Sequence, residues 1–160
     1  MQRSLPLLLF IALSDPVNAA GTPPPSATAK AMASAYVGDF KKMLRENEAA
    51  PDELACVDRV PSAAVEAAMQ NTIDQALTTE ERADMERFYA STEGLRLFAL
   101  YRRWGDTDHP PSASELEAIL PLVESKVQNK LFDATSFQSL GSAEITKTIL
   151  PLLTRCSAPG

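Results

Sequence analysis

This 160-residue chain has little of what zinc proteins and nucleic-acid-binding proteins depend on. It contains one histidine, two cysteines and no run of basic residues, and its net charge is −6. An acidic chain without a basic cluster is not expected to bind nucleic acid or an anionic membrane surface. One histidine and two cysteines without ligand spacing do not form a zinc site, and we expect no metal or other cofactor.

Catalytic signatures are missing as well. The sequence contains no G-x-S-x-G, no glycine-rich phosphate loop, no H-E-x-x-H and no dinucleotide fingerprint. A serine triad would have to use His109, with Asp106 or Asp108 as the orienting acid. These aspartates share a short, proline-stiffened loop with the histidine and are poorly placed for that role. Glu80 and Glu81 are better explained as first-turn capping groups than as an acid/base pair. No catalytic residue is therefore predicted.

Long apolar runs are confined to the N-terminus. Leu5–Leu13 is too short to span a bilayer as a stable helix, and Arg3 supplies a positive charge before it. Val17–Ala19 has the small-x-small pattern of a signal-peptide cleavage site. Residues 1–19 are therefore predicted to be a secretory signal peptide cleaved after Ala19. The mature protein is expected to be periplasmic or secreted, with no integral membrane segment.

Composition divides the remaining chain into three parts. Residues 20–27 are rich in proline and are expected to form a flexible spacer. Residues 28–156 are long enough to bury roughly two thirds of the surface that the unfolded chain exposes, so we expect one domain there. Residues 157–160 are expected to be a short tail.

Apolar residues recur at helical spacing through most of this domain, and no sustained period-two run indicates a strand. We expect an all-α fold, a compact bundle of five to seven short helices stacked as hairpins. Outside the central stretch we expect five helices. The first three are Ala27–Asn47 with Met32, Tyr36, Phe40 and Leu44 inward, a short helix from Pro51, and Ala63–Leu77 with Val65, Met69, Ile73 and Leu77 inward. The fourth is capped by Ser114, is kinked or split at Pro121 and has Leu116, Ile119, Leu120, Val123, Val127 and Leu131 on its apolar face, and the last begins at Ser142 with Ile145, Ile149 and Leu153 inward.

The central stretch, Leu77–Phe98, is predicted to be two helices joined at a tight corner. Thr78 and Glu81 are spaced as a capping box, in which each side chain accepts the backbone amide of the other residue. Ser91 can end the first helix and cap the second. Gly94 lacks a Cβ atom, so a neighbouring helix can approach closely there.

The same stretch resembles a known family. The pattern L-T-x-E-E, followed by F-Y-x-S-x-x-G and a small apolar cluster, resembles the core motif of a bacterial family known as domain of unknown function 2059. Members of that family often have proline where this chain has Thr92. The resemblance implies an all-helical periplasmic protein and brings no known catalytic residues. The matching residues are Leu77, Thr78, Glu80, Glu81, Phe88, Tyr89, Ser91, Gly94 and Leu97.

A weak internal similarity appears at a shift of 34 residues. The shift brings Glu81, Ser91 and the Arg-Leu-Phe at 96–98 onto Glu115, Ser125 and the Lys-Leu-Phe at 130–132. This similarity is equally compatible with two related helical hairpins and with chance in an amphipathic sequence. A tetratricopeptide repeat has the same period, but its characteristic Trp, Gly, Tyr and Ala positions are not present.

Cys56 and Cys156 are the two cysteines of the chain, and both lie after the predicted signal peptide. An oxidising compartment favours their pairing within the chain. An intermolecular bridge or two free thiols are the alternatives.

The end of the second central helix is the most plausible interaction surface. Tyr101 and Trp104 could serve as exposed aromatic anchors, with Arg102 and Arg103 as a local basic patch. Core packing of the aromatic residues and a solvated helix face are the alternatives. Leu95, Phe98 and Tyr101 are expected to form the apolar stripe of that helix.

These features do not define one biochemical activity. We expect a non-enzymatic protein-interaction module of the cell envelope, with an unidentified protein partner in the periplasm. The alternatives are an immunity or inhibitor protein against a secreted toxin, a small apolar-ligand carrier, and an enzyme with an unrecognised site. An open apolar groove would favour the interaction module, an enclosed cavity the carrier, and a cleft lined by buried carboxylates an enzyme.

Overall fold

The computed structural model describes residues 24–103, 106–136 and 143–156. Within these residues the chain forms seven helices of eight or more residues and two shorter helical segments, and no strand. The predicted all-α bundle is therefore confirmed. The elements are α1 (Ala27–Glu46), α2 (Pro51–Asp58), α3 (Ser62–Ala76), α4 (Thr79–Tyr89), α5 (Thr92–Arg103), α6 (Ala113–Val123), α7 (Lys126–Thr135), α8 (Ala143–Thr148) and α9 (Leu150–Thr154).

Several sequence predictions lie outside the described residues. They are the signal peptide at 1–19, the first part of the spacer, the tail at 157–160, the aromatic anchor Trp104 and the helix-opening Ser142.

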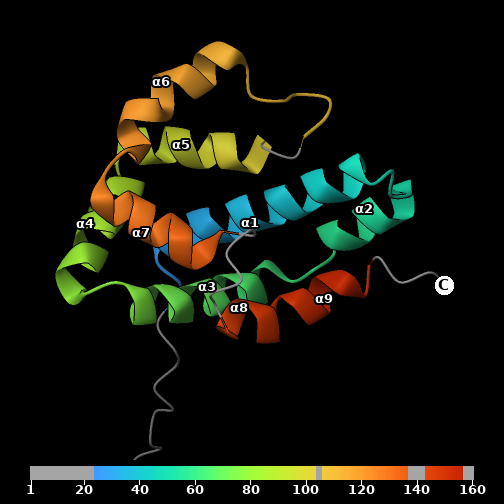
Figure 1. The fold of residues 1–160 in the computed structure, drawn as a ribbon, viewed down its shortest axis with the longest axis horizontal. Helices are drawn as coiled ribbons and strands as arrows, with labels where there is room; N and C mark the ends of the chain where they lie inside the picture. Colours follow the sequence, from blue (N-terminus) through green and yellow to red (C-terminus); the bar gives the residue numbers. More distant parts are fainter. Residues whose placement is uncertain (1–23, 104–105, 137–142, 157–160) are drawn as a thin grey trace, which may run out of the picture.

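The long helix α1 runs through the middle of the molecule (Figure 1). Ser26 caps it by accepting the Ala29 amide at 3.1 Å. Helices α5 and α6 lie on one side of α1 in this view, and α3, α8 and α9 lie on the other, while α7 crosses near its N-terminal half. The predicted i, i+4 stripe of α1 is confirmed, because Met32, Tyr36, Phe40 and Leu44 are all buried. An apolar stripe of this kind makes α1 the element against which the others pack.

The stripes predicted for α3 and for the C-terminal segments are confirmed as well. Val65, Met69 and Ile73 of α3 are buried, as is Leu77 directly after it. The same core contains Ile145 of α8, Leu153 of α9 and Ile149 between these two helices. Pro51 opens α2 and Pro151 lies in the first turn of α9, where the missing amide hydrogen removes no helical bond. A disulfide joins Cys56 to Cys156, which confirms the predicted pairing within the chain.

The corner between α4 and α5 also has the predicted construction. The Thr78 hydroxyl accepts the Glu81 amide at 3.3 Å, and the Glu81 carboxylate accepts the Thr78 amide at 2.8 Å. Ser91 then accepts the Gly94 amide at 3.2 Å as α5 begins. A Cβ atom added at Gly94 would lie 2.0 Å from the backbone oxygen of Phe88, so only glycine allows α4 and α5 to meet this closely.

The apolar face predicted for α5 is partly wrong. Leu95 is 56% exposed, and the face that packs inward carries Gly94, Leu97, Leu100 and Tyr101 instead. The close contact at Gly94 fixes the rotation of α5 about its axis, and that rotation turns the neighbouring Leu95 outward.

The helix predicted from Ser114 begins two residues earlier and divides in two. Ser112 is its cap, and Ser112 and Glu115 form a capping box, because Glu115 rather than Glu117 reaches back to the cap amide at 2.8 Å. Pro121 lies inside α6, which ends at Val123, and Ser125 then caps α7. Proline removes a helical hydrogen bond and so favours an early end of α6.

The similarity at a shift of 34 residues is matched by the helix boundaries. Adding 34 to the bounds of α4 gives those of α6, and the same shift moves the first residue of α5 onto that of α7. Ser112 repeats the capping box of Thr78, and Leu97 and Leu131 are both fully buried. The agreement favours two related helical hairpins over chance.

Candidate binding site

An apolar cavity of about 440 Å³ lies between α1, α5, α6 and α7. Its size falls within the range of small-molecule pockets in proteins. Apart from a few polar groups at its edge, its surface is formed by aromatic and aliphatic side chains. We call it the apolar cavity; it is lined by Met32, Ala35, Tyr36, Asp39, Tyr101, Leu116, Ile119, Leu120, Phe132, Thr135 and Ser136.

The cavity exists because α6 does not pack fully against the helices beneath it. None of the α6 side chains whose placement is described is fully buried, and Leu120 at the edge of the cavity is 54% exposed. The Arg103 guanidinium of α5 holds the first turn of α6 by donating to Glu115 Oε2 at 2.8 Å. This ion pair joins the first turn of α6 to the end of α5, while Ile119 of α6 packs, partly buried, against the core.

The opposite wall is formed by α5 and α7, which contact each other and α4. Tyr101 and Phe132 meet edge to face, with ring centroids 6.1 Å apart. Behind them the buried Gln128 side chain donates to the Tyr89 hydroxyl at 2.5 Å and fixes α7 against α4. On the surface Lys130 donates to Glu81 Oε2 at 2.7 Å across the same two helices. These contacts join α7 to α5 on one side and to α4 on the other.

The aromatic hydroxyl groups around the cavity are neutral at physiological pH. Burial raises the pKa of Tyr36. Burial also raises the pKa of Tyr89 to about 12, against the opposing effect of the Gln128 hydrogen bond. The pKa of Tyr101 is raised by burial first, and then by its neighbours Tyr89 and Asp39. A ligand in the cavity would therefore meet neutral phenol groups and no phenolate.

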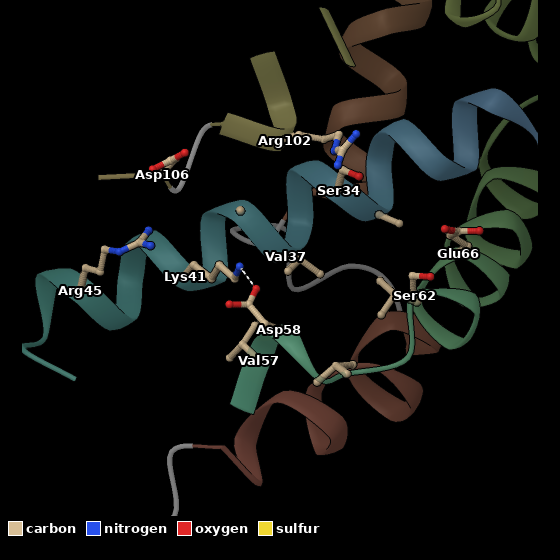
Figure 2. Close-up of a pocket in the computed structure, with 14 residues that line it drawn as sticks. Ser34, Val37, Lys41, Arg45, Val57, Asp58, Ser62, Glu66, Arg102 and Asp106 are labelled. Carbon is tan, nitrogen blue, oxygen red and sulfur yellow. Dashed lines mark hydrogen bonds and ion pairs between the residues drawn. The ribbon is translucent and has the colours of Figure 1, made fainter. Parts of the chain in front are cut away.

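A second hollow of about 390 Å³ runs along another face of α1 and shares no residue with the apolar cavity. Figure 2 shows Ser34, Val37, Lys41 and Arg45 following one another along α1, with α2 and α3 on one side and Arg102 of α5 on the other. Lys41 forms an ion pair with Asp58 across the hollow. We call it the α1 groove; it is lined by Ala33, Ser34, Val37, Gly38, Lys41, Arg45, Val57, Asp58, Val60, Ser62, Val65, Glu66, Arg102 and Asp106.

The described residues of the predicted interaction surface are distributed over three environments. Tyr101 is only 8% exposed and lies in the wall of the apolar cavity, so it does not offer an exposed anchor. Arg102 is exposed on the rim of the α1 groove. Arg103 is half-buried and paired with Glu115. The sequence pattern missed α6 as a cavity wall, because its leucines and isoleucine have the same spacing as a core stripe.

The remaining candidate chemistry stays at the surface. The His109 side chain is 82% exposed, and its Nδ1 lies 3.9 Å from Asp106 Oδ2. The backbone amides of His109 and Asp108 lower the pKa of Asp106, and the charges of His109 and Arg45 lower it further. Among the described residues, no group of three or more histidine, cysteine, aspartate or glutamate side chains could hold a metal ion.

Comparisons of this chain with protein-family models, with curated proteins and with solved structures found no match. In the described part of the chain, no helix has both the length and the apolar character needed to cross a membrane.

Proposed function

We propose that this protein is a non-enzymatic binding protein that holds a small apolar molecule in the cavity between α1, α5, α6 and α7. The observation that carries the proposal is the cavity itself, an apolar space of about 440 Å³ bounded by four helices. Buried carboxylates, which would favour an enzyme, do not line it. Among the described residues of its lining, the one carboxylate is that of Asp39, at a half-buried position.

The lining determines the class of ligand. Aliphatic side chains from α6 face Met32, Tyr36 and Phe132, which favours an acyl chain or an apolar ring over a polar metabolite. The Asp39 carboxylate would repel a second negative charge, so an acidic ligand would have to keep its head group at the open edge. We therefore expect neutral apolar compounds to bind best.

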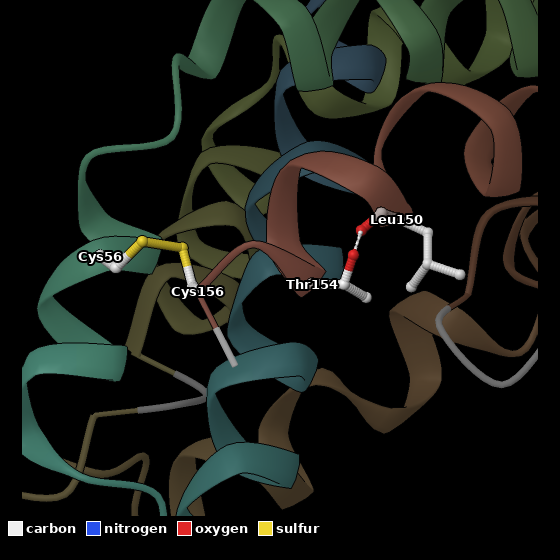
Figure 3. Close-up of a disulfide and its surroundings, with 4 residues drawn as sticks. All are labelled: Cys56, Leu150, Thr154 and Cys156. Carbon is white, nitrogen blue, oxygen red and sulfur yellow. Dashed lines mark hydrogen bonds between the residues drawn. A yellow bond between two sulfur atoms is a disulfide. The ribbon is translucent and has the colours of Figure 1, made fainter. Parts of the chain in front are cut away.

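The disulfide supports a location outside the reducing cytoplasm. Figure 3 shows the bridge between Cys56 of α2 and Cys156, which follows α9. Disulfides persist mainly in oxidising compartments. Together with the predicted signal peptide, this favours a periplasmic or secreted binding protein.

The test is the binding of N-phenyl-1-naphthylamine, a neutral apolar fluorophore, to the oxidised protein. We expect a saturable rise in fluorescence. Ala35→Leu should weaken binding roughly tenfold, because the added side chain occupies the apolar cavity; a tenfold loss is about 1.4 kcal/mol. Ala99→Leu is the matched control, an alanine-to-leucine change on the exposed face of α5. No saturable binding, or equal weakening by both variants, would overturn the proposal.

A protein-interaction module remains the second candidate, because Leu120 is exposed at the edge of the cavity and a partner could insert an apolar side chain there. A pull-down from periplasmic extract with the mature, oxidised protein tests it. Leu120→Ser should abolish capture of a saturable partner, whereas Leu95→Ser should not, although both leucines are equally exposed on helices. Capture that both variants retain would refute this role for the cavity.

A further inference from the structure

The geometry of the α1 groove points to a second ligand: we propose that it binds a short, extended peptide with apolar side chains and free ends, its carboxylate at Arg45 and its amino group at Glu66. The groove shares no lining residue with the apolar cavity, so this inference does not depend on the proposed function.

The length of the groove fits such a peptide. From Ser34 to Arg45 the axis of α1 rises about 17 Å, at roughly 1.5 Å per residue. An extended chain advances about 3.3 Å per residue, so about five residues would span this distance.

The middle of the groove is apolar. Val37 of α1 and Val60 of the link after α2 are partly exposed in its lining, whereas Val57 of α2 and Val65 of α3 are each only 2% exposed. Branched aliphatic walls of this kind favour alanine, valine or leucine side chains over charged ones. The Lys41–Asp58 ion pair joins two walls at this level and supplies polar atoms for a peptide backbone.

One end of the groove carries Arg45, whose guanidinium has one nitrogen without a hydrogen-bond partner among the described residues. Arg45 Nη1 is buried and has no hydrogen-bond partner in the part of the chain that the structure describes. Asp106 is close enough for the charge of Arg45 to lower its pKa, but it accepts no hydrogen bond from Arg45 Nη1; Asp106 Oδ1 accepts the amides of Asp108 and His109 at 2.9 and 3.1 Å. A buried guanidinium nitrogen without a partner is costly, and a ligand carboxylate would supply a charge-assisted hydrogen bond.

The other end carries a negative charge. Figure 2 shows Glu66 beside Ser62 on α3, at the end of the groove opposite Arg45. Glu66 is half-buried and forms no hydrogen bond or ion pair with another described residue. Arg102 and Asp106 also line the groove, and Lys41 is paired with Asp58. Arg45 and Glu66 stand at opposite ends with hydrogen-bonding capacity that no described residue uses, and the charged ends of a zwitterionic peptide would complement them.

The test uses affinity selection with mass spectrometry. The oxidised protein is mixed with a pool of free-ended pentapeptides that carry alanine, valine, leucine or phenylalanine at the three central positions, and with the same pool amidated at the C-terminus. We expect at least tenfold stronger retention of the free-acid pool. Arg45→Gln should remove this preference, whereas Arg96→Gln, which changes an exposed arginine outside the groove, should retain it.

Two further variants separate a blocked groove from a damaged fold. Ser34→Leu places a larger side chain in the groove and improves helix propensity, and Asn71→Leu makes a similar change at an exposed position of α3. Only Ser34→Leu should abolish peptide retention, while both should bind the apolar fluorophore as the parent protein does. Failure to retain any free-ended pentapeptide, or equal retention of the amidated pool, would overturn the inference.

Discussion

Replacing Gly94 with alanine tests the corner on which α5 is positioned. Helix propensity alone predicts that this change stabilises the protein, because alanine is about 1 kcal/mol more favourable than glycine inside a helix. The structure predicts the opposite sign. The new Cβ atom would lie 2.0 Å from the Phe88 oxygen and 2.6 Å from the Tyr89 Cα atom. Both are backbone atoms, which cannot rotate away as a side chain could.

The cost follows from what has to move. Restoring ordinary contact distances requires α5 to shift from the end of α4 by roughly 1 Å, which loosens the packing at their contact. The shift also stretches the bond from the Leu95 amide to the Ser91 oxygen, now 2.8 Å. Overpacking of this kind costs about 1–3 kcal/mol, and the gain in propensity offsets only part of it. We expect a net loss of up to roughly 2 kcal/mol in the free energy of unfolding, the upper end of that cost less the gain in propensity.

Equilibrium urea unfolding of the oxidised protein, followed by circular dichroism, measures this loss. Ala99→Gly is the companion variant, because it reports the propensity difference at an exposed position of the same helix. We expect Ala99→Gly to destabilise by about 1 kcal/mol. Equal or greater stability of Gly94→Ala than of the parent would refute the steric account of the corner.

Three further outcomes follow from other contacts. Replacing Cys56 and Cys156 with serine removes a link between residues 100 apart in sequence. In urea titrations this should lower the free energy of unfolding by at most about 4.7 kcal/mol. An unchanged free energy of unfolding would contradict a structural role for the disulfide. Arg103 and Ser112 lower the pKa of Glu115 to about 2 from its ordinary 4.5, so ionised Glu115 stabilises the fold above pH 4.5 and this contribution is lost as the pH falls toward 2. The free energies of unfolding of the parent and of Glu115→Gln, measured against pH, should differ above pH 4.5 and converge as the pH falls toward 2. Parallel curves would argue against a stabilising Arg103–Glu115 ion pair. Tyr89→Phe leaves the buried Gln128 amide without its acceptor and should cost about 1–2 kcal/mol, part of which Tyr89→Phe/Gln128→Leu should recover in a double-mutant cycle.

The features that the sequence predicted correctly are local. Spacings of four residues place Met32, Tyr36, Phe40 and Leu44 on one face, and this regularity specifies a buried helix whatever packs against it. A capping box needs only two residues three apart, which is why the start of α4 could be predicted to the residue.

The features that could not be predicted depend on contacts between helices. Leu95 has the spacing of a core residue, yet the approach of α4 at Gly94 rotates it outward. Leu116, Ile119 and Leu120 form an ordinary apolar stripe, and nothing in their spacing shows that they border a cavity. Whether an apolar face is filled or left open depends on how closely its neighbours approach, and only the assembled structure contains that information.

The two related hairpins show what sets that approach. In the first, Gly94 lets α4 pack closely on the start of α5. The shift of 34 residues places Gln128 at the corresponding position of the second hairpin, where a Cβ atom excludes an equally tight corner. Helix α6 accordingly contacts α5 through the Arg103–Glu115 pair instead of packing along α7 (Figure 1). Gln128 is itself used to bind Tyr89. Gln128 thus links α7 to α4, whereas Gly94 at the corresponding position of the first hairpin forms the close contact between α4 and α5.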